Sequence, residues 1–318
     1  MLQYNRQVNL FTAMIYKGSA LSSIWPHLTL NFIVSALATA AFMKGGIPLS
    51  ESLSLTPFSL IGLALSIFLG FRNNACYDRF WEGRKLWGSL VNTSRTLTRQ
   101  MLTLIGPGGG EVEITADDNE IKSFQHRMVY HVMAYVHALR HHLRDTEPYA
   151  DLERFLPKEE VARLRIERNV PVAIIQTMAD ELAAGWRGGW IHSFHLPSLE
   201  AQLTSLTNIQ GGCERIKATP IPMSYTLLTH RIVGVYTFTL PFALVSSTGW
   251  MTPFASLLVA YAFFGLDAIG GQIEAPFDTD PNDLPLSALS TTIEIGLRQR
   301  LGETDLPANP APVDHILS

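Results

Sequence analysis

The sequence predicts an all-α integral membrane protein with four spans and a helical cytoplasmic domain, and three observations support this fold class. The stretch 232–266 contains no charged residue, which makes it too long for one membrane span and about right for two. Two further uncharged runs lie near the N-terminus. The segment between these regions shows apolar residues at helical spacing, without an alternating strand pattern of useful length.

The four predicted spans form two pairs. In the N-terminal pair, the uncharged runs are 24–43 and 52–71, and the second run ends abruptly at Arg72. A helix that crosses roughly 30 Å of hydrocarbon needs about 20 residues, which is close to the length of each run. In the C-terminal pair, turn-forming residues at 246–250 and the following Pro253 predict a break between two short helices.

Basic residues predict the orientation of the spans, because short loops rich in lysine and arginine stay in the cytoplasm. The short loops on the side away from the termini offer only Lys44. We therefore expect both termini in the cytoplasm, and we expect the first apolar run to be an anchor and not a cleaved signal peptide. The basic residues that flank the spans on the terminal side are Arg6, Lys17, Arg72, Arg79, Arg84, Lys85, Arg215, Lys217 and Arg231.

The spans divide the chain into five expected regions. These are a cytoplasmic N-terminal segment (1–21), a first transmembrane hairpin (22–71), a cytoplasmic helical domain (72–226), a second transmembrane hairpin (227–270) and a cytoplasmic C-terminal segment (271–318). The second span is expected to continue into the cytoplasm as a helix, and 105–111 is expected to be a loop. Further helices are predicted at 121–143, 152–168, 171–186, 199–217 and 289–301.

Composition narrows the possible function classes. Hydrophobic residues make up 47% of the chain and charged residues 16%, while the net charge of -4 gives no sign of a nucleic-acid partner. The two cysteines, Cys76 and Cys213, are both expected on the reducing cytoplasmic side and form no CxxC pair. We therefore expect no disulfide, no zinc ribbon and no cofactor.

No catalytic motif is recognisable, so we do not expect an enzyme. The sequence has no GxSxG and no HExxH, and no Lys-Ser or Lys-Thr pair follows the glycine-rich segment as a phosphate-binding loop would require. Five histidines crowd one predicted helix, and two of them have the i, i+4 spacing of metal ligands. The favoured interpretation is a solvated or inter-helix face, and a metal site stays open as the alternative. The histidines are His126, His131, His137, His141 and His142, with Arg140 and Arg144 between and beside them.

Asp267 is an acid at the edge of a predicted span. Acids inside membranes are functional hypotheses by default, because a buried charge there is costly. The position of Asp267 at the cytoplasmic boundary favours a helix-end or salt-bridge role over ion translocation.

The second span carries two stripes of residues at i, i+4, i+8 spacing. Leu63, Ile67 and Phe71 form a bulky apolar stripe. Beside it lies a small-residue stripe, which allows close helix approach in lipid and is expected in helix contacts; its members are Gly62, Ser66 and Gly70. On periodicity alone, a lipid-facing position for the bulky stripe is favoured over a pore-facing one.

Several segments, taken in this order together with the spans, support a family assignment. They are 47–50 (IPLS), 67–80 (IFLGFRNNACYDRF), 85–88 (KLWG), 221–226 (IPMSYT), 264–270 (FGLDAIG), 276–277 (PF) and 282–285 (NDLP). Through them the chain resembles the bestrophin family, in its bacterial branch, over residues 20–300.

The resemblance implies a homopentamer in which five second-span helices surround a central pore. Family members conduct ions, chiefly chloride and other small anions in animals, while charge selectivity varies among bacterial relatives. The family has a hydrophobic neck of three residues on the second span. The matching positions here are Leu63, Ile67 and Phe71, so the bulky stripe changes from an expected lipid face to an expected pore wall.

The resemblance also bears on two further family features, a calcium site and a second constriction. Animal members bind calcium with acids that follow Asn-Pro-Phe after the fourth span. Here Asp280 and Asp283 could superpose, but Ala275 replaces the asparagine and the acids are too few, so we expect no bound metal. The family also has a second constriction, formed by one apolar side chain on a cytosolic helix, and Ile174 and Ile175 are the candidates here.

We therefore expect a channel for small monovalent ions, chloride first among them, in the bacterial inner membrane. Its partners would be the lipid bilayer and further copies of the chain. The alternatives are a sodium or potassium channel of the same architecture, a secondary transporter and a membrane-anchored scaffold. Four spans without an inverted repeat or a broken helix disfavour the transporter. Charge selectivity stays open, since Arg72 and Arg79 favour anions while Glu51 and Asp267 favour cations.

Overall fold

The computed structural model describes residues 21–45, 54–106, 118–312 and 317. Across these residues the chain is helical and contains no named strand, so the all-α prediction is confirmed for the described part. The chain divides into two compact units, which we call the apolar unit (Leu2–Trp81 and Pro220–Pro276) and the polar unit (mainly Glu82–Thr219 and Phe277–Ser318). Several sequence features lie outside the described residues, namely Arg6, Lys17, Glu51, segment 47–50 and most of the glycine-rich segment 105–111.

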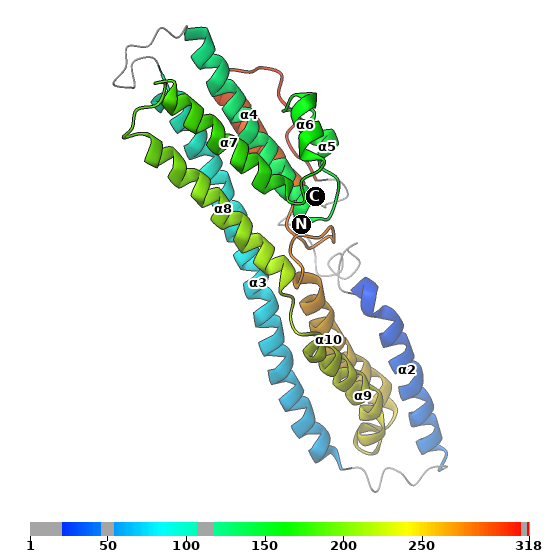
Figure 1. The fold of residues 1–318 in the computed structure, drawn as a ribbon. Helices are drawn as coiled ribbons and strands as arrows, with labels where there is room; N and C mark the ends of the chain where they lie inside the picture. The colour runs from blue at the N-terminus through cyan, green and yellow to red at the C-terminus, as the bar shows by residue number, and fades with distance from the viewer. Residues whose placement is uncertain (1–20, 46–53, 107–117, 313–316, 318) are drawn as a thin grey trace. The chain divides into compact units, whose positions relative to one another are not determined.

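The apolar unit contains the helices that the charge-free runs predict (Figure 1). These are α2 (Leu21–Met43), the first part of α3 (Leu55–Leu104), α9 (Met223–Thr248) and α10 (Thr252–Ile273). A 3-10 turn, η2 (Gly249–Met251), separates α9 from α10 where a break was predicted. Gly249 has φ +52°, a value that suits glycine, and Pro253 lies in the first turn of α10.

Length and composition make three described stretches suitable for crossing a membrane. They are Ser23–Met43, Leu55–Leu104 and Met223–Ile273, and the last of these contains both α9 and α10. The second stretch is the single helix α3, which runs for 50 residues without an internal break. The prediction that the second span continues as a helix beyond Arg72 is therefore confirmed.

The core of the apolar unit forms where α2, α9 and α10 pack against one another. A buried amide joins these three helices: Asn31 Nδ2 donates to Thr237 O at 2.8 Å, and Ser256 Oγ donates to Asn31 Oδ1 at 3.1 Å. Helix α3 joins this core through Leu65 and Leu69, which are both buried. Buried polar groups in lipid need partners of this kind, so Asn31 stabilises one arrangement of the helices.

An ion pair links α3 to α10. Arg72 Nη1 lies 2.5 Å from Asp267 Oδ1, and the Arg72 side chain is almost completely buried. Asp267 Oδ2 also lies 2.5 Å from Nδ1 of His230 on α9, and Asn73 Nδ2 donates to Leu266 O at 3.0 Å. The prediction of a salt-bridge role for Asp267 is confirmed by these contacts.

The polar unit consists of six further helices and the second part of α3. They are α4 (Asp118–Leu143), α5 (Tyr149–Leu152), α6 (Lys158–Leu164), α7 (Val170–Arg187), α8 (Leu196–Ala218) and α11 (Leu286–Arg300). The predicted helices at 121–143, 171–186, 199–217 and 289–301 correspond to α4, α7, α8 and α11. The single helix predicted at 152–168 is wrong. Helix α5 ends at Leu152 and α6 covers only Lys158–Leu164, because Pro157, which lacks an N–H donor, is the N-cap of α6.

The histidines of α4 contact carboxylates on other elements of the polar unit. Each imidazole lies within hydrogen-bonding or ion-pairing distance of at least one acid, so α4 is joined to its neighbours along its length, as the inter-helix interpretation requires. The pairs are His131 with Glu160 (2.8 Å), His137 with Glu294 (3.0 Å), His141 with Asp151 (3.0 Å), His142 with Glu214 (2.9 Å) and His126 with Glu303 (3.3 Å). Within the described ranges, no three His, Cys, Asp or Glu side chains converge as a metal site.

These pairs shift the pKa values of the carboxyl groups. The imidazole of His137, whose Nδ1 lies 3.8 Å from Asp151 Oδ2, and the hydrogen bond with His141 hold the pKa of Asp151 far below its usual range, and Arg140 adds to the effect. Burial alone would raise the pKa of Glu294, but its hydrogen bond with His137 and the nearby positive charges outweigh burial, so the pKa is lowered. The ionised carboxylates therefore stabilise the folded polar unit.

We predict that removing Asp267 destabilises the apolar unit strongly. In Asp267→Asn, Arg72 would keep a buried charge without its nearest anionic partner, while Glu274 Oε2 stays 3.7 Å from Arg72 Nη2; loss of one partner of a buried pair typically costs about 3–5 kcal/mol. The double variant Arg72→Met/Asp267→Leu should be less destabilised than Asp267→Asn, because neither charge remains. Thermal unfolding in mild detergent measures both, with Arg231→Gln as the exposed control. An unchanged unfolding temperature for Asp267→Asn would contradict this account.

We also predict an acid-sensitive step in the polar unit. The pKa of Asp151 is lowered on folding, so its contribution is present above the unfolded-state pKa of about 3.9 and is lost as the pH falls below that value. Between pH 5 and pH 3 the unfolding temperature of the parent should fall more steeply than that of Asp151→Asn. Glu153→Gln, at a half-exposed acid, is the control and should keep the parent's slope. Parallel curves for the parent and Asp151→Asn would show that this carboxylate is not responsible.

Candidate functional site

The bulky apolar stripe on α3 faces away from the other helices of its own chain. The side chains of Leu63, Ile67 and Phe71 are 62%, 52% and 66% exposed. Their apolar surface is left uncovered by the apolar unit itself. In a membrane protein such a surface contacts lipid, another subunit or a pore.

The opposite face of α3 is buried within the apolar unit. Its members recur at intervals of three and four residues, which is the spacing of one helix face, and they are Gly62, Leu65, Leu69, Arg72 and Cys76. Adjacent residues on a helix point about 100° apart. With Arg72 held inward by Asp267, Phe71 points outward, and Ile67 and Leu63 follow it at intervals of one turn.

The small-residue stripe divides between the two faces. Gly62 lies against α9, because a Cβ atom at this position would lie 2.4 Å from Tyr236 Oη. Ser66 and Gly70 are exposed, and no atom lies within 4 Å of a Cβ built on Gly70. Ser66 Oγ donates to Gly62 O at 2.8 Å, so its hydroxyl is satisfied within α3. Gly62 alone of the three therefore contacts a helix of the same chain.

Other exposed residues of α3 near the stripe are also apolar. Leu60, Ile61 and Phe68 are about half exposed or more. Helix α3 is therefore apolar around its outward surface, which is typical of a helix that is surrounded in its assembled state. The stripe and its two flanks together form a surface that the isolated chain leaves unpaired.

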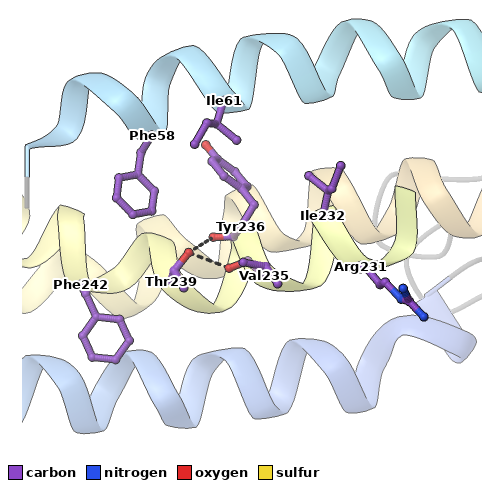
Figure 2. A pocket seen from close by; sticks show the side chains of 8 residues that line it. All are labelled: Phe58, Ile61, Arg231, Ile232, Val235, Tyr236, Thr239 and Phe242. Atoms are coloured by element: carbon purple, nitrogen blue, oxygen red, sulfur yellow. Dashed lines mark hydrogen bonds between the residues drawn. The ribbon is translucent and has the colours of Figure 1, made fainter. Parts of the chain in front are cut away.

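A groove of about 630 Å³ lies between α3 and α9 in the apolar unit (Figure 2). Phe58 and Ile61 line it from α3, and Tyr236 points from α9 toward α3. Thr239 Oγ1 donates to Val235 O at 2.6 Å and to Tyr236 O at 3.3 Å, so the hydroxyl is occupied within α9. With few free polar groups, the groove suits hydrocarbon and offers little to replace the hydration shell of an ion.

The two cytosolic candidates for a second constriction lie on α7 in the polar unit. Ile174 is completely buried in the core, and Ile175 is partly buried. A side chain that faces a pore must be exposed in an isolated chain, so Ile174 does not fit the role. Apolar side chains of the polar unit that are prominently exposed, and that sequence analysis did not single out, are Ile166, Val172, Trp186 and Phe194.

The segment compared with the animal calcium site holds two exposed acids, Asp278 and Asp280, and one buried acid, Asp283. Asp280 is exposed, whereas Asp283 is buried and its Oδ2 accepts a hydrogen bond from the Asp280 N–H at 2.7 Å. Burial, together with the nearby charges of Asp280 and Asp278, raises the pKa of Asp283 to about 6. The observed contact of Asp283 is therefore a turn hydrogen bond within this segment.

Sequence analysis assigned Arg72 to the flank of a span and missed its structural role. The structure buries Arg72 against Asp267, 195 residues further along the chain. A signal for this pair was present, because each residue is the first charge after a charge-free run. Two opposite charges at the same membrane depth are suitable partners.

Comparisons with known proteins agree with this architecture. A family model described as Bacterial/Fungal Bestrophin protein matches residues 1–299. A Ralstonia nicotianae protein named voltage-dependent anion channel-forming protein RSc3414 is 43% identical over 96% of this chain and 95% of its own length. The Escherichia coli K12 protein named voltage-dependent anion channel-forming protein YneE is 38% identical over 95% of this chain and 94% of its own length.

A solved structure gives the same result in three dimensions. The crystal structure of a bacterial bestrophin homologue from Klebsiella pneumoniae superposes with a TM-score of 0.79 at 36% sequence identity, and the match covers 88% of this chain and 99% of that one. The family model, the related sequences and the related fold all span most of the chain. The chain therefore belongs to the bestrophin family, in its bacterial and fungal branch.

Proposed function

We propose that this protein is a pentameric channel that conducts small monovalent anions, such as chloride, through a pore with a hydrophobic neck. The observation that carries the proposal is the exposed stripe of Leu63, Ile67 and Phe71 on a helix whose opposite face is buried in its own chain. The names of the Ralstonia and Escherichia relatives, voltage-dependent anion channel-forming proteins, support anions as the conducted ions.

The proposed pentamer is based on the apolar surface of α3 that the isolated chain leaves exposed. A ring of five α3 helices would place the bulky stripe toward the axis and cover the flanks with neighbouring helices. Ser66 and Gly70, which are exposed in the chain, would then allow close approach between subunits. Cyclic symmetry satisfies such an arrangement because each helix offers the same two sides to its neighbours.

The proposed placement is the bacterial inner membrane, with four spans and both termini in the cytoplasm. Helices α2, α9 and α10 and the first part of α3 would cross the bilayer. The ion pair of Arg72 and Asp267 would then lie near the cytoplasmic edge of the hydrocarbon, where a salt bridge offsets the cost of burying either charge.

Charge selectivity in this proposal does not come from Arg72 or Asp267. In the sequence, Arg72 favoured anions and Asp267 favoured cations. In the structure the two side chains are paired at 2.5 Å and largely buried, so their charges offset each other. An apolar neck dehydrates ions of either sign. The sign of the conducted ion must therefore depend on charges in the vestibules.

A reconstitution experiment tests the proposed function. Purified protein in planar bilayers with a KCl gradient should give unitary current steps and a reversal potential close to the chloride equilibrium potential. A reversal potential near that of potassium would replace the anion channel with a cation channel of the same architecture. Slow saturable flux without steps would indicate a transporter, and the absence of flux would favour a membrane-anchored scaffold.

We predict that Leu63, Ile67 and Phe71 form the gate. Three rings of large apolar side chains offer an ion no replacement for its hydration shell, so the barrier should arise from dehydration. The variant Leu63→Ala/Ile67→Ala/Phe71→Ala should raise conductance or open probability severalfold with little change in charge selectivity, as measured by single-channel recording. The matched control is Val235→Ala/Leu258→Ala, at exposed apolar residues of α9 and α10. If the control opens the pore and the triple variant does not, the stripe faces lipid.

A second variant separates the neck from helix packing. Gly62→Leu should impair folding or assembly, because even a Cβ at this position would clash with Tyr236. The combined variant Gly62→Ala/Tyr236→Phe removes the clashing hydroxyl and should recover part of the assembled protein in size-exclusion chromatography. Normal assembly of Gly62→Leu would show that α3 does not pack against α9 as described.

A further inference from the structure

A cavity of about 590 Å³ in the polar unit is lined by three arginines and no acid. Arg95 and Arg99 lie on α3, and Arg300 is the last residue of α11. Leu102 and Thr103 of α3 and Gly296 and Gln299 of α11 complete the lining. The volume falls in the range of roughly 300–1,000 Å³ that is usual for small-molecule sites.

The three guanidinium groups have no anionic partner among the residues that the structure describes. None of them forms an ion pair or donates a side-chain hydrogen bond to another residue in those ranges. Some other arginines of the polar unit form ion pairs, as Arg127 does with Glu181 and Arg298 with Glu303. The arginine cavity therefore carries a local excess of positive charge.

A second cavity of the polar unit provides a contrast. It has a similar volume of about 560 Å³, but Glu160 and Glu167 line it together with Arg163 and Arg168. The charges in its lining are balanced. The two cavities are similar in size, but acids line only the second, so the excess of positive charge in the lining distinguishes the arginine cavity from this one.

Helix stability does not account for the cluster. Arg300 lies in the last turn of α11, where a positive charge offsets the helix dipole. Arg95 and Arg99 lie before the last turn of α3, so they have no such role. Their i, i+4 spacing places two exposed like charges on one face of the helix, which is mildly unfavourable, and an anion bound between them would offset the repulsion.

We propose that this cavity binds a polyvalent anion that carries phosphate groups, such as pyrophosphate or the phosphate chain of a nucleotide. Each guanidinium is planar and presents several N–H donors in a fork that matches phosphate oxygens. Three of them supply more donors and more charge than a single chloride ion uses. The side chain of Gln299 adds an uncharged hydrogen-bond donor at the cavity wall, whereas the Thr103 hydroxyl already donates to Arg99 O at 2.8 Å.

Binding measurements on the full-length protein in detergent test the site without recording currents. By isothermal titration calorimetry in gluconate buffer, pyrophosphate should bind saturably to the parent protein. Arg95→Gln/Arg99→Gln/Arg300→Gln should weaken binding by at least about tenfold, since charge-assisted hydrogen bonds are lost. The matched control Arg163→Gln/Arg168→Gln, in the balanced cavity, should bind as the parent does. Adenosine triphosphate, pyrophosphate and inorganic phosphate are compared, and the tightest of them identifies the source of the phosphate.

A further variant, Gly296→Leu, is designed to fill the arginine cavity without removing its three arginines. No atom lies within 4 Å of a Cβ built on Gly296, so Gly296→Leu can be accommodated in α11 and should occupy the ligand's space. It should lose binding as the triple variant does, while both keep the parent's oligomeric mass. The proposal is overturned if the parent shows no saturable binding, if either variant binds like the parent, or if the triple variant dissociates the oligomer.

Discussion

The buried ion pair between Arg72 and Asp267 is the interaction on which the orientation of α3 depends. A guanidinium that is almost completely buried cannot leave its carboxylate without a large cost, typically about 3–5 kcal/mol when one partner is lost. Rotation of α3 about its axis would separate the pair. Because Phe71 is the adjacent residue, holding Arg72 inward also holds the bulky stripe outward, and His230 and Asn73 support the same position through Asp267 and Leu266.

The two units differ in how they use charge, because the apolar unit is proposed to lie in the bilayer and the polar unit in water. The described part of the apolar unit keeps its core hydrophobic and joins its helices through buried polar contacts, such as that of Asn31 with Thr237. The polar unit is organised around α4, whose histidines meet acids on several elements. Lowered pKa values at Asp151 and Glu294 show that these acids are stabilised in their charged forms. The arginine cavity differs from these pairs because no acid is among its lining residues.

Much of this fold was predictable because hydrophobic runs and turn residues act locally. The charge-free runs correctly predicted the long apolar helices, and the turn-forming residues near Gly249 correctly predicted the break between α9 and α10. Errors arose where the decisive contact was distant or where one residue was overlooked. Pro157 divides the region that was predicted as one helix. The burial of Ile174 belongs to a repeat of apolar residues on α7 that the search for a single constriction overlooked, and Arg72 could be placed only once its distant partner was known.

The central claim is that the stripe on α3 faces an aqueous pore, and thiol accessibility tests it most directly. Both native cysteines, Cys76 and Cys213, are buried, so an introduced cysteine can be followed against a low background. A charged, membrane-impermeant methanethiosulfonate reagent should react with Ile67→Cys in reconstituted channels and change the single-channel conductance. It should leave Val235→Cys, an exposed position on α9, unmodified. Reaction at Val235→Cys without reaction at Ile67→Cys would contradict the account and place the stripe in lipid.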